Sequence, residues 1–478
     1  MRILFPMEKN SMKQHWLGIM TLSAVLKKGG FKTEVVVAEE KVVAEKLKEN
    51  GHTIMAYSTP TFLAKFNIEF NQKIKKRFKN VYSIFGGPHA TYYPEMIENE
   101  GVDAICVGEG EGAIHELATN LANGLPLTNI MNLWVKENGT IHKNPLRPLV
   151  ENLDELPYPD RDIFLPYRHP EYPLSSIWTM SARGCPYKCT YCFNHSYNKL
   201  YQEHGYSAVK VRRRSVDSFI GELVEIKKRW PATYFVFVDD IFVLMPKWVK
   251  EFSEKYKKMV DIPFFCHVRA NAVSNDVISD IKKAGCALIK MGVEAGNDRL
   301  RREVLKRNMS KEHIINAAKI IRAHGIKLQT FNLLGIPTSN INNDFETLEL
   351  NASCKPDYAM TFIMRAYKKT EIYEFSRMRN LLHEEFIEDV ADTQNIFFSS
   401  PITINSKEAK ALENLLYLFS ISVKYPFLVP LVRKFLVKLP LSNIYKLIFL
   451  NHYRYVKLFC SPKKLRRAYI YLMTVLHK

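Results

Sequence analysis

The segment Ser181-Ala-Arg-Gly-Cys-Pro-Tyr-Lys-Cys-Thr-Tyr-Cys-Phe193 decides how the rest of the chain is interpreted. It contains Cys185, Cys189 and Cys192 in the pattern C-x3-C-x2-C. Three thiolates at this spacing can hold one iron–sulfur cluster, with each sulfur on a different iron. Because no fourth cysteine follows at close spacing, one iron of a four-iron cluster would stay open to bind a small molecule.

A structural zinc site and a disulfide are the alternative interpretations of this segment. Structural zinc sites take four ligands, and the nearest further candidate, His195, would give a cramped spacing. The remaining cysteines stand singly in apolar surroundings, which indicates a reducing compartment and packing as small hydrophobic side chains: Cys106, Cys266, Cys286, Cys354 and Cys460. The sequence therefore favours a cluster.

These residues resemble the radical S-adenosylmethionine (SAM) superfamily, whose signature usually has an aromatic residue before the third cysteine, as Tyr191 is here. In that family the open iron of a [4Fe-4S] cluster chelates the amino and carboxylate groups of SAM. An electron from the cluster then cleaves SAM to a 5′-deoxyadenosyl radical. The resemblance implies both cofactors and an electron donor such as flavodoxin or ferredoxin.

Strand and helix patterns alternate six times across residues 172–375. Parallel strands between amphipathic helices predict a partial (βα)6 TIM-like barrel, with the cysteine loop at its carboxyl rim. The expected strands are 177–181, 234–239, 264–269, 287–294, 328–334 and 358–366.

Polar residues at the ends of these strands are candidates for the site. We expect Asp239 and Arg269 to contact SAM or the substrate, with helix capping and turn formation as the alternative. The family resemblance implies that Glu294, in the segment GVEAG, lies near SAM. It also implies that Gly335, Ile336 and Pro337 line the adenine side. The family often has PGT after the sixth strand, where this chain has Lys368-Lys-Thr370, so the turn expected there is in doubt.

Residues 1–125 alternate five short apolar strands with helices, which predicts a parallel, Rossmann-like (flavodoxin-like) sheet covered on both faces. Ligands of such sheets bind beyond the carboxyl ends of the strands. Three loops stand there, and their glycines and hydroxyl groups suit a ligand that approaches the backbone closely. Taken alone, these loops fit a nucleotide pocket or plain tight turns equally well. They contain Ser58 and Thr59; Gly86, Gly87, His89 and Thr91; and Gly108, Glu109 and Gly110.

Together with the segment Asp154-Glu-Leu-Pro-Tyr-Pro-Asp-Arg161, these loops resemble the cobalamin-binding domain that precedes the radical SAM motif in one large subfamily. The resemblance implies that the nine loop residues bind cobalamin. The motif D-x-H-x-x-G, whose histidine ligates cobalt in methionine-synthase-like proteins, is absent. The implied binding mode has no protein histidine on cobalt. His89 and His15 are candidate axial groups, with a surface or turn role as the alternative.

Residues 126–171 are expected to form a linker, with a β-hairpin that turns at Asn138-Gly139. Residues 376–478 are expected to be mostly helical. From Pro401 onward the chain has ten Lys and four Arg against two Glu, a net charge of +12. This tail predicts either a helical cap on the barrel or a basic amphipathic surface for an anionic membrane or a lipid-linked substrate. Nucleic acid is a third, less favoured partner. We expect neither a signal peptide nor a transmembrane helix, and a cytoplasmic enzyme with possible membrane association.

The resemblance implies a cobalamin-dependent radical SAM enzyme that methylates an unactivated carbon or phosphorus centre of a small-molecule or lipid-linked substrate. One alternative keeps both cofactors but forms or rearranges rings without methyl transfer. A second has lost cobalamin. A third, from a different class, is an iron–sulfur electron carrier, which the missing fourth cysteine and the predicted barrel disfavour.

Overall fold

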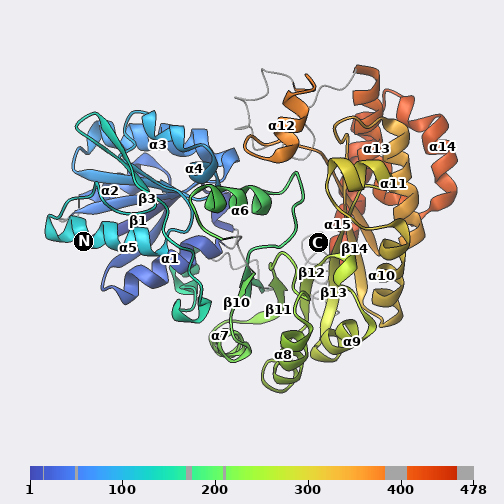
Figure 1. The fold of residues 1–478 in the computed structure, drawn as a ribbon, viewed down its shortest axis with the longest axis horizontal. Helices are drawn as coiled ribbons and strands as arrows, with labels where there is room; N and C mark the ends of the chain where they lie inside the picture. The colour runs from blue at the N-terminus through green and yellow to red at the C-terminus, as the bar shows by residue number, and fades with distance from the viewer. Residues whose placement is uncertain (14–15, 49–51, 168–174, 208–210, 383–405, 460–478) are drawn as a thin grey trace, which may run out of the picture. The chain divides into compact units, whose positions relative to one another are not determined.

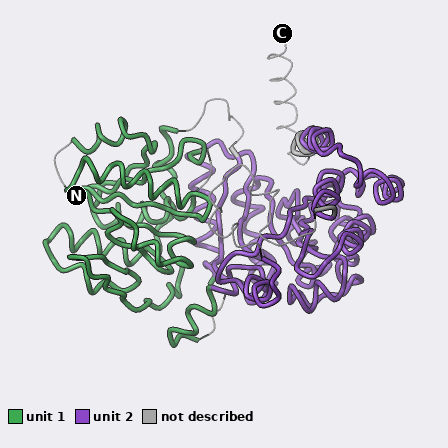
Figure 2. The backbone as a smooth tube through the Cα atoms, turned by 90° about the horizontal axis from the view of Figure 1, so that it is seen from above, with its two compact units in different colours: residues 1–172, 197–212, 388–396 green, residues 173–196, 213–387, 397–478 purple. Residues whose placement is uncertain are grey.

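The computed structural model describes residues 1–478 except 14–15, 49–51, 168–174, 208–210, 383–405 and 460–478. The chain divides into two compact α/β units (Figure 2). Apart from these gaps, unit 1 contains residues 1–172 and 197–212, and unit 2 contains residues 173–196, 213–387 and 397–478. The α/β class expected from the sequence is confirmed.

Unit 1 is built on a seven-stranded sheet of order β2-β1-β3-β4-β5-β6-β7 (Figure 1). Its first five strands are parallel, and each lies where the apolar runs of the sequence predict it. They are β1 (Arg2–Met7), β2 (Lys32–Val37), β3 (Thr53–Ser58), β4 (Val81–Gly86) and β5 (Ala104–Cys106). The helices between them are α1 (Leu17–Lys28), α2 (Glu40–Leu47), α3 (Ala64–Arg77), α4 (Pro88–Tyr92) and α5 (Glu111–Asn123).

Strand β1 shows why this sheet is covered on both faces. Ile3 and Phe5 belong to a core that includes buried residues of α1 and α5. Leu4 belongs to a second core that includes Phe70 and Ile74 of α3. Successive side chains of a strand point to opposite faces, so an uninterrupted apolar strand needs helices on both sides.

The predicted hairpin is part of this sheet and not a separate linker. Strand β6 (Leu133–Glu137) pairs antiparallel with β5 and with β7 (Thr140–Lys143). Asn138 and Gly139 both have positive φ angles, 49° and 79°, as a two-residue type I′ turn requires. Unit 1 therefore extends beyond the boundary at residue 125 expected from the sequence.

Helix α6 (Phe193–Glu203) follows the cysteine loop directly. Its residues from Tyr197 onward belong to unit 1, although the sequence placed the whole segment in the barrel. The physical reason is burial: Tyr201 is fully buried in the α3-side core of unit 1. Arg212 also forms an ion pair with Glu109 of the same unit, at 2.9 Å.

Unit 2 contains a six-stranded parallel sheet of order β15-β14-β13-β12-β11-β8, which is an open, partial barrel of the radical SAM type. The strands are β8 (Ser175–Thr179), β11 (Ala232–Phe237), β12 (Phe264–Val268), β13 (Cys286–Glu294), β14 (Lys327–Leu334) and β15 (Tyr358–Ile363). Helices α7 (Val216–Arg229), α8 (Pro246–Met259), α9 (Asn275–Ala284), α10 (Lys311–Ala323) and α11 (Ile341–Cys354) connect them.

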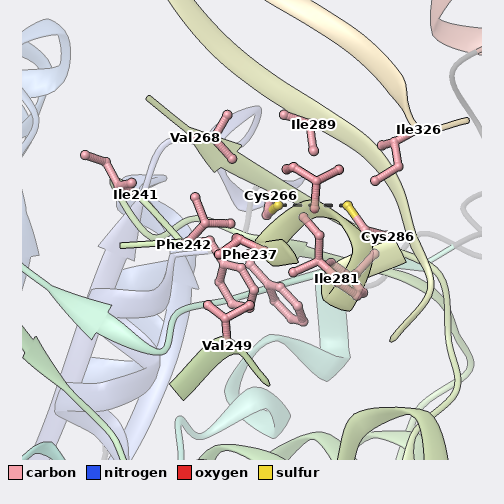
Figure 3. Close-up of a cluster of buried hydrophobic side chains, with 14 of the residues drawn as sticks. Phe237, Ile241, Phe242, Val249, Cys266, Val268, Ile281, Cys286, Ile289 and Ile326 are labelled. Carbon is pink, nitrogen blue, oxygen red and sulfur yellow. Dashed lines mark hydrogen bonds between the residues drawn. The ribbon is translucent and has the colours of Figure 1, made fainter. Parts of the chain in front are cut away.

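The core between this sheet and its helices is aromatic and contains two of the isolated cysteines. Phe237 and Phe242 stack with their ring centroids 5.0 Å apart. The sulfurs of Cys266 and Cys286 lie 3.9 Å apart in the same core (Figure 3). Cys106 and Cys354 are also buried free thiols, as expected of small hydrophobic side chains. Cys460 lies outside the described residues.

In its described residues, the C-terminal region adds the α-helices α12 (Glu371–Arg377), α13 (Ser406–Lys424), α14 (Val429–Lys434) and α15 (Ser442–Phe459). Leu415, Leu416 and Phe419 of α13 share a core with Phe345 of α11 and Ile363 of β15. Helix α13 therefore covers the edge strand of the barrel, which would otherwise present unpaired backbone groups. Within the described parts of the chain, no helix is long and apolar enough to span a membrane.

Candidate functional site

The three cysteines of the motif lie on one loop that follows β8 at the carboxyl end of the barrel sheet. All three are free thiols; Cys189 is buried and Cys185 and Cys192 are partly buried. The backbone N–H of Cys192 donates to the carbonyl of Cys189 at 3.1 Å, which closes a tight turn between the second and third cysteines. The spacing C-x3-C-x2-C is thus a compact turn in three dimensions.

Thr190, between the second and third cysteines, anchors this loop to two other segments of unit 2. Its hydroxyl donates to the carbonyl of Val304 at 2.7 Å, and its own carbonyl accepts from the backbone N–H of Ile372 at 2.9 Å. Val304 ends a short π-helix, Leu300–Val304, and such turns occur frequently at functional sites. The loop conformation therefore depends on segments more than 100 residues away in the sequence.

Two buried arginines approach the sulfur of Cys189. The guanidinium of Arg269 donates to it at 3.2 Å, and that of Arg307 lies 3.9 Å from it. Arg269 also stacks over the ring of Tyr187, with 3.9 Å between the guanidinium carbon and the ring centroid. Arg269 was expected to contact SAM or the substrate; the structure places it against a cluster cysteine.

The thiols fit an iron–sulfur cluster better than a single metal ion. Within the described residues, no three His, Cys, Asp or Glu side chains converge closely enough to bind one ion. A four-iron cluster has no such need, because each thiolate binds a different iron. Burial raises the pKa of Cys185 to about 12 and raises the pKa of Cys192. Their thiolates are thus favoured only beside a cationic centre, which the irons of a cluster would provide.

Two polar pairs flank the cysteines on the side of α6. Asn194 donates to the carboxylate of Asp240 at 2.8 Å and lies 3.8 Å from the sulfur of Cys192. The Nε2 atom of His195 lies 3.1 Å from the carboxylate of Glu371. The imidazole that was considered as a zinc ligand is therefore engaged with a carboxylate.

Asp239 lies beneath the loop rather than in an open position. Its carboxylate accepts hydrogen bonds from the backbone N–H and the hydroxyl of Ser181, and Arg213 lies 3.9 Å away. Burial raises the pKa of Asp239, and Arg213 opposes that shift. The contacts of this carboxylate orient the start of the cysteine segment.

The residues assigned to SAM by resemblance partly converge. Arg307 donates to the hydroxyl of Tyr191 at 3.1 Å and lies 3.8 Å from the carboxylate of Glu294. Burial raises the pKa of Glu294, and Arg307 and a hydrogen bond from Tyr191 oppose the shift. A Cβ atom on Gly292 would lie 2.4 Å from the Glu294 carboxylate. The first glycine of GVEAG thus makes room for the glutamate.

The segment Gly335-Ile336-Pro337 follows β14. Ile336 is buried in an apolar cluster against which Tyr191 also packs, so two predicted SAM residues share one cluster. The N–H of Gly335, which has a φ of 64°, donates to the carboxylate of Asp344 at 3.2 Å. Burial raises the pKa of Asp344 to about 8. The loop at Lys368-Lys-Thr370 also turns, with Lys369 at a φ of 67°.

In unit 1, backbone hydrogen bonds join two of the predicted loops at the carboxyl ends of β3 and β4, where Ser58 pairs with Gly86. The N–H of Thr59 donates to the carbonyl of Gly86 at 2.8 Å, and the N–H of His89 donates to the carbonyl of Thr59 at 2.9 Å. Gly87 has a φ of 91°, and a Cβ atom there would lie 3.2 Å from the nitrogen of Thr59. Only glycine fits this position without strain.

Thr91 connects these loops to the third. Its hydroxyl donates to the carbonyl of Gly87 at 3.0 Å and accepts from the N–H of Gly108 at 3.1 Å. Gly108 faces the hydroxyl of Tyr201, which a Cβ atom at Gly108 would meet at 2.5 Å. The following Gly110 precedes α5, the helix that starts at Glu111. The loops are thus one continuous structure.

Glu109 differs from its neighbours because its carboxylate is used inside unit 1. It accepts from both terminal nitrogens of Arg212, at 2.9 and 3.0 Å, and from the N–H of Val150 at 2.9 Å. These contacts give Glu109 a structural role in holding residues 197–212 on the unit.

His89 is the candidate axial group that the structure describes; His15 lies outside the described residues. The ring of His89 stacks on Tyr93 with 4.5 Å between centroids. Its buried Nδ1 atom has no hydrogen-bond partner, and burial lowers the pKa of His89 to about 4. A neutral imidazole with an unsatisfied nitrogen, beside glycines that allow close approach, fits a cobalamin site.

Sequence reasoning missed several residues that organise these sites. Arg307 and Thr190 act through partners more than 100 residues away, and Asp344 acts through the backbone N–H of Gly335, nine residues away. No local motif therefore identifies them. Arg301 is fully buried and donates to the carbonyls of Ala295 and Met309. The sequence around it, Asp298-Arg-Leu-Arg-Arg-Glu303, is highly charged, so nothing in the local pattern distinguishes Arg301 from its neighbours.

Comparisons with known proteins agree with this geometry. The family model of the radical SAM superfamily matches residues 180–350, and that of the B12 binding domain matches residues 7–118. The chain is 30% identical to an uncharacterized methyltransferase of Pyrococcus horikoshii over 332 residues, covering 68% of this chain and 69% of the relative.

A second relative is the anaerobic magnesium-protoporphyrin IX monomethyl ester cyclase of Rubrivivax gelatinosus, at 24% identity over 71% of this chain and 62% of the relative. Among solved structures, the cobalamin-dependent radical enzyme OxsB with aqua-cobalamin and SAM bound has a TM-score of 0.70. That match has 16% identity and covers 96% of this chain and 71% of OxsB. The protein therefore belongs to the cobalamin-binding radical SAM enzymes, with a [4Fe-4S] cluster, SAM and cobalamin as cofactors.

Proposed function

We propose that this enzyme methylates an unactivated carbon or phosphorus centre. The observation that carries the proposal is the pairing, in one chain related to a methyltransferase, of the cysteine loop in unit 2 with the linked glycine loops in unit 1. The bound cofactors would supply a 5′-deoxyadenosyl radical for hydrogen abstraction and a methyl group for transfer. The chain's own residues hold and orient these groups.

In unit 2, Cys185, Cys189 and Cys192 would bind three irons and leave the fourth open to SAM. Glu294 would accept hydrogen bonds from the amino group of SAM, and Arg307 and Tyr191 hold that carboxylate in place. Gly335, Ile336 and Pro337 would line the adenine side of SAM. Asp344 would hold this segment in position, because its carboxylate accepts a hydrogen bond from the N–H of Gly335.

In unit 1, the cobalamin site would be made mainly of backbone. Gly86, Gly87, Gly108 and Gly110 let the loops pack closely on the residues behind them, such as Thr59 and Tyr201. Thr59 and Thr91 hold the loops together, and the backbone of the loops would face the cofactor. His89 would face the cofactor as a neutral group, because burial keeps its pKa near 4.

The substrate class and partners follow from the same proposal. We infer a small-molecule or lipid-linked substrate, an electron donor such as flavodoxin or ferredoxin, and peripheral contact of the C-terminal region with a membrane. The excess of cations in that region supports the last point.

Two products of SAM test the proposal. After anaerobic reconstitution with iron, sulfide and hydroxocobalamin, iron and cobalt per chain are measured first. The reduced enzyme is then incubated with SAM. Methylation predicts both 5′-deoxyadenosine, from radical cleavage, and S-adenosylhomocysteine, from donation of the methyl group. A Cys189→Ala variant should lose the first product, and a Gly87→Ala variant should yield less of the second.

Ring formation without methyl transfer is the second candidate, and the similarity to the magnesium-protoporphyrin cyclase favours it. That reaction predicts 5′-deoxyadenosine without S-adenosylhomocysteine at full cobalt occupancy. Such a result would replace methylation by the cyclase reaction, while absence of both products would contradict both candidates.

A further inference from the structure

The exposed apolar side chains of this protein are concentrated in one segment. Among the residues whose side chains the structure describes, 18 large hydrophobic side chains are exposed, and ten of them lie between Tyr425 and Leu450. The most exposed are Phe427 at 76%, Leu447 at 61%, Ile444 at 54% and Phe435 at 52%. Isolated exposed apolar residues are ordinary, but a contiguous set marks an interaction site. We call these ten side chains the C-terminal apolar surface.

This surface is not produced by poor packing of the helices that carry it. Val429 and Val432 of α14, together with Val437, are buried in the core formed with α13. In α15, Tyr445 is buried and Phe449 packs against the same core. Both helices thus bury an apolar face. Helix α15 also exposes a second one, although a surface helix of a globular protein normally has a polar outer face, and Leu431 of α14 is exposed along with Phe427 and Phe435 on either side of that helix.

Helix α15 shows the pattern most clearly. Ile444, Leu447 and Ile448 are spaced by three and four residues, so they share one helical face. Tyr445 and Phe449, four residues apart, occupy the face packed on α13. The exposed face of α15 is therefore a continuous apolar stripe.

The charged residues of the segment that carries the C-terminal apolar surface are all basic. Residues 424–452 contain four Lys and one Arg and no Asp or Glu. Arg433 is used internally, because it bonds Glu349 of α11 at 2.6 Å and lies over the ring of Phe345. Lys424, Lys434, Lys438 and Lys446 are exposed among the apolar side chains.

We propose that the C-terminal apolar surface binds the interface of an anionic lipid bilayer. Phenylalanine and leucine side chains would enter the boundary between head groups and acyl chains, and the four lysines would lie at the anionic head groups. A second copy of the chain is a poorer occupant, because it would bring two surfaces of like charge together. The proposal deepens the membrane contact suggested above and does not depend on the reaction, since lipid binding needs neither SAM nor a reductant.

Sedimentation of the reconstituted full chain with lipid vesicles tests this. We expect the protein to sediment with vesicles containing phosphatidylglycerol, much less with phosphatidylcholine alone, and less as salt is raised, because the lysine contribution is screened. A Phe427→Ser/Leu447→Ser variant should bind the anionic vesicles about tenfold more weakly. The matched control is Leu125→Ser/Met259→Ser, which removes two side chains that are each 51% exposed elsewhere and should leave binding unchanged.

A second readout reports insertion directly. In a Phe427→Trp variant, brominated lipids in the same vesicles should quench the added tryptophan fluorescence. Binding that survives Phe427→Ser/Leu447→Ser would overturn the proposal and assign lipid binding to other cations of the chain. If the unmodified chain does not bind vesicles but forms a concentration-dependent dimer, and Phe427→Ser/Leu447→Ser abolishes that dimer, the C-terminal apolar surface binds a second copy of the chain instead. Failure of the unmodified chain to bind the anionic vesicles, with both SAM products still formed, would refute only this inference.

Discussion

The cysteine loop of unit 2 and the glycine loops of unit 1 both stand at the carboxyl ends of parallel strands, but they are built differently. The cysteine loop places side chains at its centre: three thiols, with Arg269 and Arg307 at one of them. The glycine loops are held by backbone groups and Thr91, and the carboxylate among them, Glu109, is used for internal contacts. A metal cluster needs charged ligands at fixed points, whereas a large organic cofactor needs room and close backbone approach.

Replacing one thiol should have the largest effect in this comparison. Cys189→Ala removes one of the three proposed cluster ligands and leaves Arg269 and Arg307 without the sulfur that both approach. We expect bound iron to fall by about tenfold or more, measured as iron per chain after reconstitution, with cobalt binding retained. Cys354→Ala, which removes a buried thiol outside the loop, is the control. Equal iron in the two variants would contradict the ligand assignment.

Adding one methyl group at Gly87 should disturb the glycine loops enough to weaken cobalamin binding. Gly87→Ala forces a side chain into a left-handed conformation and places Cβ 3.2 Å from the nitrogen of Thr59. The affinity for hydroxocobalamin, followed by absorbance titration, should fall by about tenfold, which corresponds to about 1.4 kcal/mol. Gly124→Ala, at a φ of 65° with open space around it, also places a side chain at positive φ, but outside the loops, and should bind cobalamin normally. A wild-type affinity in Gly87→Ala would remove this loop from the cobalamin site.

Arg269 should change the reduction potential of the cluster and not the amount of iron that is bound. Arg269→Gln removes a positive charge near a cluster sulfur and so disfavours the more negative reduced state. We expect the midpoint potential to fall by about 60 mV, a tenfold change for one electron, with iron content unchanged. Redox titration followed by electron paramagnetic resonance measures this. Arg377→Gln, which removes an exposed arginine bonded to Glu374, is the control, and an identical shift in both variants would refute the assignment.

The last test concerns the pH dependence of the stability of unit 1. Burial lowers the pKa of His89 to about 4. Between about pH 6.5 and pH 4, His89 is therefore protonated in the unfolded chain but neutral in the folded chain. Stability should therefore fall as pH decreases from about 6.5 to 4, by about 2 kcal/mol at pH 5. His89→Phe keeps a ring for Tyr93 and should flatten this dependence in thermal unfolding, whereas His52→Gln, at an exposed histidine, should not. Parallel pH profiles for wild type and His89→Phe would show that His89 is not the group responsible.

The sequence alone determined the parts of this protein that depend on local pattern. The eleven parallel strands were predictable because apolar runs of three to nine residues, bounded by glycine and polar residues, can be buried only between helices. The cysteine loop was predictable because ligand spacing is itself a local property. The hairpin turn at Asn138-Gly139 was predictable for the same reason, because the turn requires positive φ angles at these two residues, and asparagine and glycine adopt them readily.

The tertiary structure decided which distant residues complete each site. Thr190 is held by residues 304 and 372, and the sulfur of Cys189 is contacted by residues 269 and 307. It also assigned residues 197–212 to unit 1, because Tyr201 and Arg212 find their partners there. Contacts between residues so far apart depend on how the strands are ordered and how the helices pack on them. That information is distributed over the whole core, so no single stretch of the sequence contains it.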